Sequence, residues 1–118
     1  MQYMLLVYEN ESDFESLDET ERSASVGRHI AFARKLRDEG RFLYGDGLQS
    51  TTTATTVRKV KGEVVLTDGP FAETKEQLGG FYVIEAADLD QALADAAMIS
   101  DRDGELIEVR PIMDYTGH

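Results

Sequence analysis

The 118-residue chain contains no cysteine, no tryptophan and only two prolines. The absence of cysteine excludes disulfides, thiolate metal ligands and a cysteine nucleophile. No apolar run approaches the ~18 residues that a membrane span needs, and the opening MQYMLLVYENES lacks the basic start of a signal peptide. We therefore expect a cytoplasmic protein that does not associate with a membrane.

Positive charge is also scarce in this chain. Lys and Arg together number 12 against 23 Asp and Glu, which gives a formal net charge of −11. Such a chain repels a phosphate backbone, so nucleic acid is not an expected partner. The hydrophobic content of 42% is typical of an ordered globular protein. This length and composition predict one domain over residues 1–115, followed by a short tail at 116–118.

The first half of the chain has the pattern strand, helix, strand. Residues 3–8 are apolar on both alternating faces and predict a strand that is covered on both sides. Asp18 and Glu21 have the spacing of a capping box and predict a helix that ends at Gly40. A strand over 41–44 follows, and a Gly-Asp-Gly sequence is expected to break it. The helix residues that we expect to face the sheet are Val26, Ile30, Ala33 and Leu36.

The second half predicts a hairpin and a second strand–helix–strand unit. β-Branched runs at 56–61 and 63–67 flank a Lys-Gly turn. Residues 81–84 form a strand that is apolar on both faces, and Asp88 begins a helix. The last strand, 105–112, carries a proline, so it is expected either to lie at a sheet edge or to end there. The residues of this helix expected to face inward are Leu89, Leu93, Ala96 and Ala97.

This order of elements predicts an α+β fold of the ferredoxin-like sandwich type, with an antiparallel sheet, two helices on one face and an extra β-hairpin. Two helices cover only one face of such a sheet. Because the strands at 3–8 and 81–84 are apolar on both faces, a second copy of the chain is the expected cover for the other face. We therefore expect a homodimer with an enclosed pocket for an unknown small molecule.

His29 is the histidine that the sequence places near such a pocket. It lies at the border of the predicted buried stripe of the first helix, whereas His118 lies in the terminal tail. An imidazole has an ordinary pKa near 6.5, which suits a general acid or base at neutral pH. The alternative is a helix-border histidine that only forms hydrogen bonds with a backbone group or a carboxylate.

Loop carboxylates are the expected partners of this histidine. Asp46 and Asp68 lie in or near loops that could converge on one end of the sheet, where a carboxylate could orient His29 or bind a cationic group. Asp68 could instead cap the amides of its own Asp-Gly turn. Glu73 lies in the same region and is a candidate ligand-binding residue, as is Lys75, although a solvated lysine is the alternative.

Three further side chains are candidates for contact with a ligand. Tyr8 lies at the end of the first strand. Phe71 follows the Asp-Gly-Pro turn and is expected to anchor the loop in the core, with stacking on a ligand as the alternative. Arg110 shares a strand face with Glu108, so it could bind a carboxylate ligand or pair with that glutamate.

Cofactor-binding motifs are absent from the sequence. The chain contains no GxGxxG, Walker-type loop, GxSxG elbow or HExxH. The Gly-Asp-Gly turn at 45–47 lacks the following helix that a phosphate cradle requires. We therefore expect no metal and no cofactor.

The run DGPFAETKEQLGGF at residues 68–81, with YMLLVYENE, YGDGLQ and EVRPIMDY elsewhere, resembles the DGPF group of the YCII-related family. The resemblance implies a ferredoxin-like dimer of the dimeric α/β barrel type with an internal pocket. It also implies a His-Asp pair with the histidine on the first helix, where this chain has His29. The aspartate of that pair falls near the end of the second helix, where this chain has Ile99-Ser100 and then Asp101.

The sequence thus supports two functional hypotheses. The first is a small-molecule enzyme in which His29 is the general acid or base and Asp46 or Asp68 orients it. The second is a ligand-binding or regulatory module without catalysis. Because some relatives are encoded beside or fused to alternative sigma factors, the resemblance also implies a possible sigma factor association.

Overall fold

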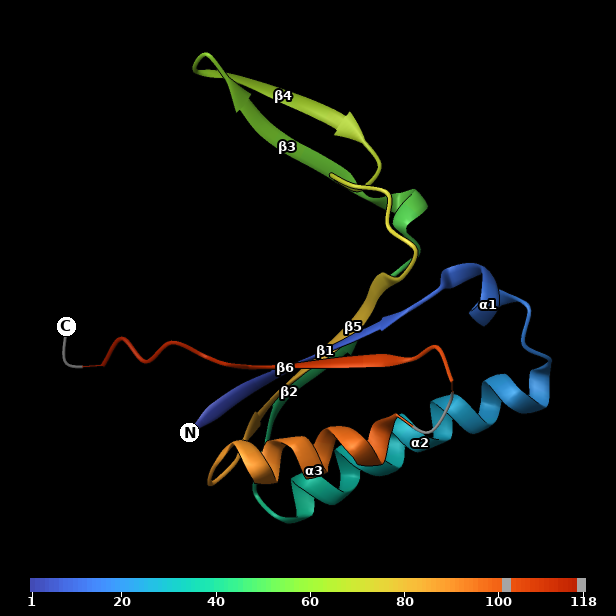
Figure 1. Ribbon diagram of the computed structural model, residues 1–118, viewed down its shortest axis with the longest axis vertical. Helices are drawn as coiled ribbons and strands as arrows, with labels where there is room; N and C mark the ends of the chain where they lie inside the picture. The colour runs from blue at the N-terminus through green and yellow to red at the C-terminus, as the bar shows by residue number, and fades with distance from the viewer. Residues whose placement is uncertain (101–102, 117–118) are drawn as a thin grey trace.

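The structure is a computed structural model that describes residues 1–100 and 103–116. Asp101, His118 and the last part of the predicted tail therefore lie outside the described residues. The described strands and helices, shown in Figure 1, are β1 (Gln2–Glu9), α1 (Glu11–Glu15), α2 (Glu19–Asp38), β2 (Phe42–Gly47), β3 (Thr55–Val60), β4 (Glu63–Asp68), β5 (Gln77–Glu85), α3 (Leu89–Ile99) and β6 (Leu106–Pro111), with a 3-10 turn at Thr51–Thr53.

The main sheet has four strands in the order β2-β5-β1-β6, and each neighbouring pair is antiparallel. Helices α2 and α3 both lie against the same face of this sheet (Figure 1). This arrangement confirms the predicted ferredoxin-like α+β fold. Strand β6, which contains Pro111, is an edge strand as predicted.

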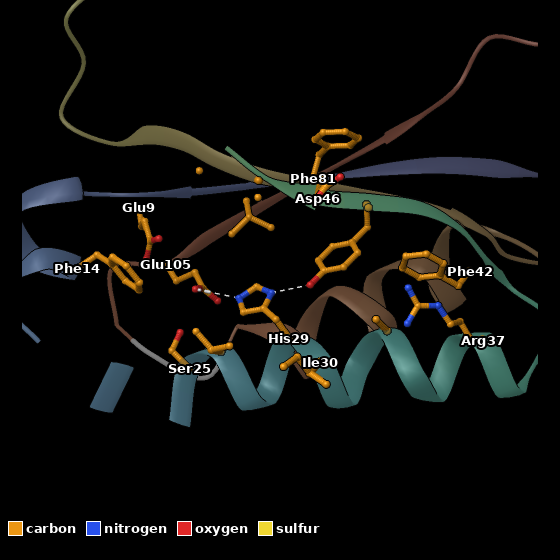
Figure 2. Close-up of a pocket in the computed structure, with 18 residues that line it drawn as sticks. Glu9, Phe14, Ser25, His29, Ile30, Arg37, Phe42, Asp46, Phe81 and Glu105 are labelled. Carbon is orange, nitrogen blue, oxygen red and sulfur yellow. Dashed lines mark hydrogen bonds and ion pairs between the residues drawn. The ribbon is translucent and has the colours of Figure 1, made fainter. Parts of the chain in front are cut away.

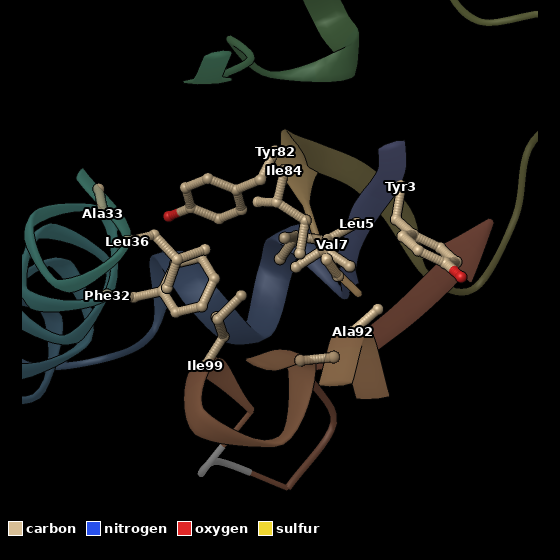
Figure 3. Packing of buried hydrophobic residues seen from close by; sticks show 12 residues of the cluster. Tyr3, Leu5, Val7, Phe32, Ala33, Leu36, Tyr82, Ile84, Ala92 and Ile99 are labelled. Carbon is tan, nitrogen blue, oxygen red and sulfur yellow. The ribbon is translucent and has the colours of Figure 1, made fainter. Parts of the chain in front are cut away.

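The core lies between this helix-covered face and the two helices. Tyr3, Leu5 and Val7 point inward from β1, as the alternation of a strand requires, and each is buried. They pack with buried residues of β5, α2 and α3, as Figure 3 shows. The side chains that the helices and β5 contribute to this core include Phe32, Leu36, Ile84, Ala92 and Ile99.

Helix α2 begins and ends at the predicted residues. The Asp18 side chain accepts a hydrogen bond of 2.8 Å from the Glu21 amide, and the Glu21 side chain accepts one from the Asp18 amide. This is the predicted capping box, which satisfies amides that the first helical turn leaves unpaired. At the other end Gly40 has a φ of +72°, which is the left-handed conformation expected of a glycine that ends a helix.

The predicted inward faces of both long helices are partly wrong. Ala33, Leu36 and Ala96 are buried as predicted, whereas Val26 is 48% exposed and Ile30 is 53% exposed. On α3 the buried face is rotated by about one position, because Ala92, Asp95 and Ile99 lie against the core. The residues predicted to face inward that the structure leaves exposed are Val26, Ile30, Leu89, Leu93 and Ala97.

Strand β2 continues through the Gly-Asp-Gly sequence at 45–47, so the prediction that this sequence breaks the strand is wrong. Asp46 pairs with Phe81 and Gly47 with Gly80, so the glycines are part of the sheet. The sequence prediction also missed the short helix α1. Its N-cap is Asn10, whose side chain accepts a hydrogen bond of 3.0 Å from the Asp13 amide.

Strands β3 and β4 form the predicted hairpin, and it projects from the body on the side away from the helices (Figure 1). Its turn residues, Lys61 and Gly62, both have positive φ, as the two-residue turn of a hairpin requires. Every residue of β4 is exposed. The hairpin therefore contributes almost nothing to the core of its own chain, and we call residues 55–68 the arm.

The base of the arm is tied to the body by side-chain hydrogen bonds. Glu11 accepts hydrogen bonds of 2.8 Å from the Thr51 amide and from the Thr51 hydroxyl. The Glu11 amide donates to the Gln77 side chain, and the Asn10 side chain donates to the Lys75 carbonyl. Both chain segments that lead to and from the arm are thus fixed to the start of α1.

A buried ion pair joins the start of β2 to α3, and it provides a test of the fold. The Arg41 guanidinium donates two hydrogen bonds, of 2.7 and 2.9 Å, to the buried carboxylate of Asp95. Without Asp95, the largely buried Arg41 keeps only the half-exposed Glu39 and the Glu85 carbonyl as partners, and it loses both hydrogen bonds of the buried pair. We expect Asp95→Ala to lower the free energy of unfolding by about 3 kcal/mol, measured by urea denaturation. Lys35→Ala, which removes an exposed ion pair with Glu39, should cause a much smaller loss.

Candidate functional site

A cavity of about 360 Å³ lies between α2 and the sheet. This volume is at the lower end of the range for small-molecule sites. One wall is a single face of α2, because Val26, His29, Ile30, Ala33 and Arg37 recur at helical spacing of three or four residues. The opposite wall comes from β2, β5 and the end of β1, and Glu105 and Phe14 complete the lining.

His29 lies in this wall between two polar side chains (Figure 2). Its Nδ1 is 2.7 Å from the hydroxyl of Tyr82, and its Nε2 is 3.6 Å from Oε2 of Glu105. The first distance is a hydrogen bond, and the second is a charge contact when the imidazole is protonated. His29 therefore has a partner for each ring nitrogen.

Tyr82 extends from β5 under α2. Its ring packs edge-on against Phe32 and Phe42, at centroid distances of 5.0 and 6.3 Å. Gly45 on the neighbouring strand leaves room for this ring, since a Cβ atom there would lie 2.6 Å from Cδ1 of Tyr82. Burial, with a smaller contribution from the negative charge of Glu105, raises the pKa of Tyr82 to about 12. The hydroxyl consequently stays protonated at neutral pH.

Glu105 lies immediately before β6, after a turn in which Gly104 has a φ of +90°. The Ser100 hydroxyl at the end of α3 donates a hydrogen bond of 3.0 Å to the Glu105 carbonyl, which fixes this turn. The Glu105 side chain is only 1% exposed. Its Oε2 atom faces Nε2 of His29 at 3.6 Å, so the carboxylate and the imidazole meet away from bulk water.

The hydrogen-bond geometry indicates how the protons are arranged. In the neutral tautomer that carries its hydrogen on Nε2, toward Glu105, the Tyr82 hydroxyl donates to Nδ1. When Nδ1 gains a proton, both ring nitrogens become donors, with Tyr82 and Glu105 as acceptors. The arrangement can therefore hold His29 in either protonation state without moving a side chain.

The structure places the predicted carboxylate partners away from His29. Asp46 lines the cavity, but its side chain points to the opposite face of the sheet, where the Tyr44 hydroxyl donates a hydrogen bond of 3.0 Å to it. This hydrogen bond raises the pKa of Tyr44. Asp68 is the last residue of the arm and is exposed. Neither carboxylate contacts His29 within the described chain.

The other candidate ligand-binding residues also lie outside the cavity of their own chain. Phe71 is 82% exposed, so the expectation that it anchors the loop in the core is wrong. Glu73 and Lys75 lie in the exposed loop that leads from the arm to β5. Arg110 faces the uncovered side of the sheet, since it pairs with Met4, and Tyr8 alternates with the inward Val7 to the same side.

Sequence reasoning missed Tyr82 and Glu105, the polar partners of His29 among the described residues. One signal for Tyr82 was present, because a tyrosine in a strand that is apolar on both faces needs a partner for its hydroxyl. Glu105 gave no such signal, since acidic residues are common in this chain. Within residues 1–100 and 103–116, no three histidine, aspartate or glutamate side chains gather to form a metal site.

The fold and the cavity define a class of protein, a ferredoxin-like domain with a small pocket between its first long helix and its sheet. The family model of the YCII-related domain matches residues 1–116. The chain therefore belongs to the YCII-related family. It is also 39% identical to an uncharacterized protein, R00369, of Rhizobium meliloti (strain 1021), over 98% of this chain and 94% of that protein. Assignment to the narrower DGPF group stays a prediction.

A helix able to cross a membrane would have to be long and largely apolar. In the part of the chain that the structure describes, none of the helices meets both requirements.

The raised pKa of Tyr82 gives a pH dependence of stability. An unfolded tyrosine ionises near pH 10, whereas Tyr82 in the folded protein ionises near pH 12. The neutral hydroxyl makes its full contribution to the free energy of unfolding below pH 10. This contribution is lost as the pH rises from 10 to 12. Tyr82→Phe should be less stable than the wild type at pH 9, because it lacks the hydrogen bond to His29.

The difference in unfolding free energy between wild type and Tyr82→Phe should shrink between pH 10 and pH 12, as followed by urea denaturation at each pH. Tyr115→Phe, at an exposed position, is the matched control and should follow the wild-type curve. A constant difference between wild type and Tyr82→Phe from pH 10 to pH 12 would contradict the raised pKa of Tyr82.

Proposed function

We propose that the protein is a small-molecule enzyme that transfers a proton, with His29 as its general acid and base. The observation that supports this proposal is the position of His29 in the cavity wall, hydrogen-bonded to Tyr82 on one side and facing the buried Glu105 on the other. An imidazole with a buried carboxylate behind it and a reachable cavity in front has the geometry of an acid–base catalyst.

In the proposed reaction, Tyr82 passes protons between His29 and the substrate. The Tyr82 oxygen takes a proton from the substrate while its own hydroxyl proton moves to Nδ1 of His29. The resulting imidazolium donates through Nε2 toward Glu105, and the substrate is left as an anion. Return of the proton to another atom of the substrate completes an isomerisation. In an elimination the electron pair of the anion instead forms a double bond, the bond to the leaving group breaks, and the proton is delivered to the departing group. No oxidant or reductant is required for these steps.

The alternative of a ligand-binding module uses the same cavity without the proton transfer. Association with an alternative sigma factor likewise stays a prediction from the family resemblance. Transfer of a substrate proton is expected of the enzyme, and it is expected neither of a ligand-binding module nor of a sigma factor partner.

Proton transfer can be tested before the substrate is identified. The protein is incubated in D₂O with a bacterial metabolite extract, and deuterium incorporation is followed by mass spectrometry. We expect the wild type to label at least one metabolite, and His29→Gln to label it about 10²- to 10⁴-fold more slowly, since general acid–base catalysis contributes about that much. Tyr82→Phe and Glu105→Gln should also slow the labelling.

Asp68→Asn is the matched control for a carboxylate outside the cavity and should label at the wild-type rate. Loss of activity in Asp68→Asn would instead support the prediction from sequence that this carboxylate serves the site. Asp68 would then have to act on the cavity of a second copy of the chain. Equal labelling by wild type and His29→Gln would contradict the proposed function.

We also propose that the protein is a homodimer whose subunits meet at the uncovered face of the sheet and at the arm. The side of the sheet opposite the helices carries Met4, Leu6 and Val83, which are only partly exposed, together with exposed Tyr44. The arm adds an apolar strip, since Val57, Val64 and Leu66 share one face of the hairpin and are 60–65% exposed. Exposed apolar patches of this kind mark interaction surfaces.

The exposed area supports a partner of substantial size. A compact folded chain of 13.2 kDa exposes about 6,400 Å², whereas this chain exposes 8271 Å². The excess of roughly 1,900 Å² is within the range that each subunit of an obligate homodimer buries, about 1,000–2,500 Å². The radius of gyration, 16.4 Å, also exceeds the value of about 13.5 Å for a compact chain of this length.

Sedimentation at micromolar concentration tests this proposal. We expect a dimer for the wild type and a monomer for Val83→Glu and for Leu66→Glu, because each places a charge in the proposed interface. Leu93→Glu, on the solvent side of α3 with 47% exposure, is the matched control and should remain dimeric. A wild-type protein that sediments as a 13.2 kDa particle would contradict the proposal.

A further inference from the structure

Ser25 is the polar residue among those that α2 buries. The helix buries Ser25, Phe32, Ala33 and Leu36, and the other three are apolar. Ser25 is only 3% exposed, yet it lines the cavity one helical turn before His29. Figure 2 shows its hydroxyl directed from the helix toward the sheet. A hydroxyl adds nothing to apolar packing, so its presence at this buried position needs another explanation.

The Ser25 hydroxyl has no hydrogen-bond partner within residues 1–100 and 103–116. A serine in a helix often returns its hydroxyl to the carbonyl one turn earlier. In the described part of α2, the Ser25 hydroxyl does not make this bond to Glu21. Burial of a hydroxyl without a hydrogen bond is unfavourable. The hydroxyl is therefore available to a molecule that enters the cavity.

Two glycines of the sheet leave space in this cavity. Gly80 on β5 pairs with Val7 on β1 and with Gly47 on β2, so these residues form one row across three strands. Paired residues share a face of a sheet, and Val7 points toward the helices. The row therefore places one side chain beneath the helix layer, where a row without glycine would place three.

Ser25 shares its end of the cavity with a second hydrogen-bonding group. Glu105 and Phe14 lie near it in Figure 2, and all three residues line the cavity. The Glu105 side chain is only 1% exposed. A carboxylate has about four acceptor sites, so Glu105 can face His29 and also accept a hydrogen bond from a ligand. This end of the cavity thus combines a donor hydroxyl and an acceptor carboxylate with an aromatic side chain.

A ligand hydroxyl matches this pair of groups, because it accepts from Ser25 and donates to Glu105. A carbonyl oxygen can accept from Ser25 but has no hydrogen for Glu105. A carboxylate would bring a second negative charge beside a buried one, which is unfavourable at low dielectric. An ammonium group would compete with the imidazolium of His29 for the same carboxylate. The ligand group that fits best is therefore uncharged.

We propose that Ser25 is a ligand-binding residue, and that the cavity takes an uncharged small molecule with a hydroxyl at one end and an apolar body. The hydroxyl accepts a hydrogen bond from Ser25 and donates one to Glu105. The body lies over Gly47 and Gly80, against Val26. The inference names a substrate class for the function proposed above and rests on that function for the reaction, although binding can be measured without turnover.

NMR titration of the ¹⁵N-labelled full-length chain with four probes tests the inference. The probes are cyclohexanol, cyclohexanone, cyclohexylamine and cyclohexanecarboxylate, which carry different polar groups on the same kind of ring. We expect saturable binding of cyclohexanol. The other three probes should bind at least about threefold more weakly, as the loss of one hydrogen bond implies.

Three variants locate the site. Ser25→Ala should weaken cyclohexanol binding about three- to tenfold without lowering the free energy of unfolding, because this hydroxyl has no protein partner to lose. Ser23→Ala, at an exposed serine of the same helix, is the matched control and should leave binding unchanged. Glu105→Gln gives the site an amide that can donate, so cyclohexanone should then bind as well as cyclohexanol.

Three results would overturn the inference: no binding of cyclohexanol, binding that Ser25→Ala leaves unchanged, or a charged probe that binds as tightly as cyclohexanol. A loss of stability in Ser25→Ala would also overturn it, because the hydroxyl would then support the fold.

Failure of the proposed function gives a different pattern. If wild type and His29→Gln label metabolites equally in D₂O while cyclohexanol binds through Ser25, the function falls and the binding site stands. If the labelled metabolite has no hydroxyl and cyclohexanol does not bind, the function stands and the substrate class falls.

Discussion

The packing of one aromatic ring connects the core of this protein to its site. Tyr82 belongs to the buried cluster, yet its hydroxyl reaches the cavity and forms a hydrogen bond of 2.7 Å with His29. Phe32 and Phe42 hold the ring edge-on, and Gly45 provides the space beneath it. Because the ring is fixed by the core, the position of His29 relative to its partners depends on the same contacts that stabilise the fold.

The sequence was sufficient to predict most of the elements and their order, because capping residues and turn glycines act locally. The faces of the helices were harder to predict. Val26 and Ile30 are as apolar as Leu36, and apolarity alone cannot separate a residue that lines a cavity from one that fills the core. The error on α2 thus fell on the residues that form the cavity wall.

The site was predictable only in part for a related reason. His29 could be found from its residue type and helical position, whereas its partners come from β5 and from the turn before β6. The backbone of Asp46 lines the cavity, but the alternation of the strand turns its side chain to the other face of the sheet. Which of many carboxylates meets a histidine depends on strand register and on turns such as that at Gly104, and sequence patterns do not fix these.

The exposed arm has an energetic consequence for the single chain. A two-stranded hairpin without a packed face is at best marginally stable, and here its strands are held mainly by their own ladder and by the ties at Glu11. The arm and the body are therefore separate cooperative units. Opening of the β3–β4 ladder requires far less free energy than opening of the core, and it leaves His29 and the cavity beside it undisturbed.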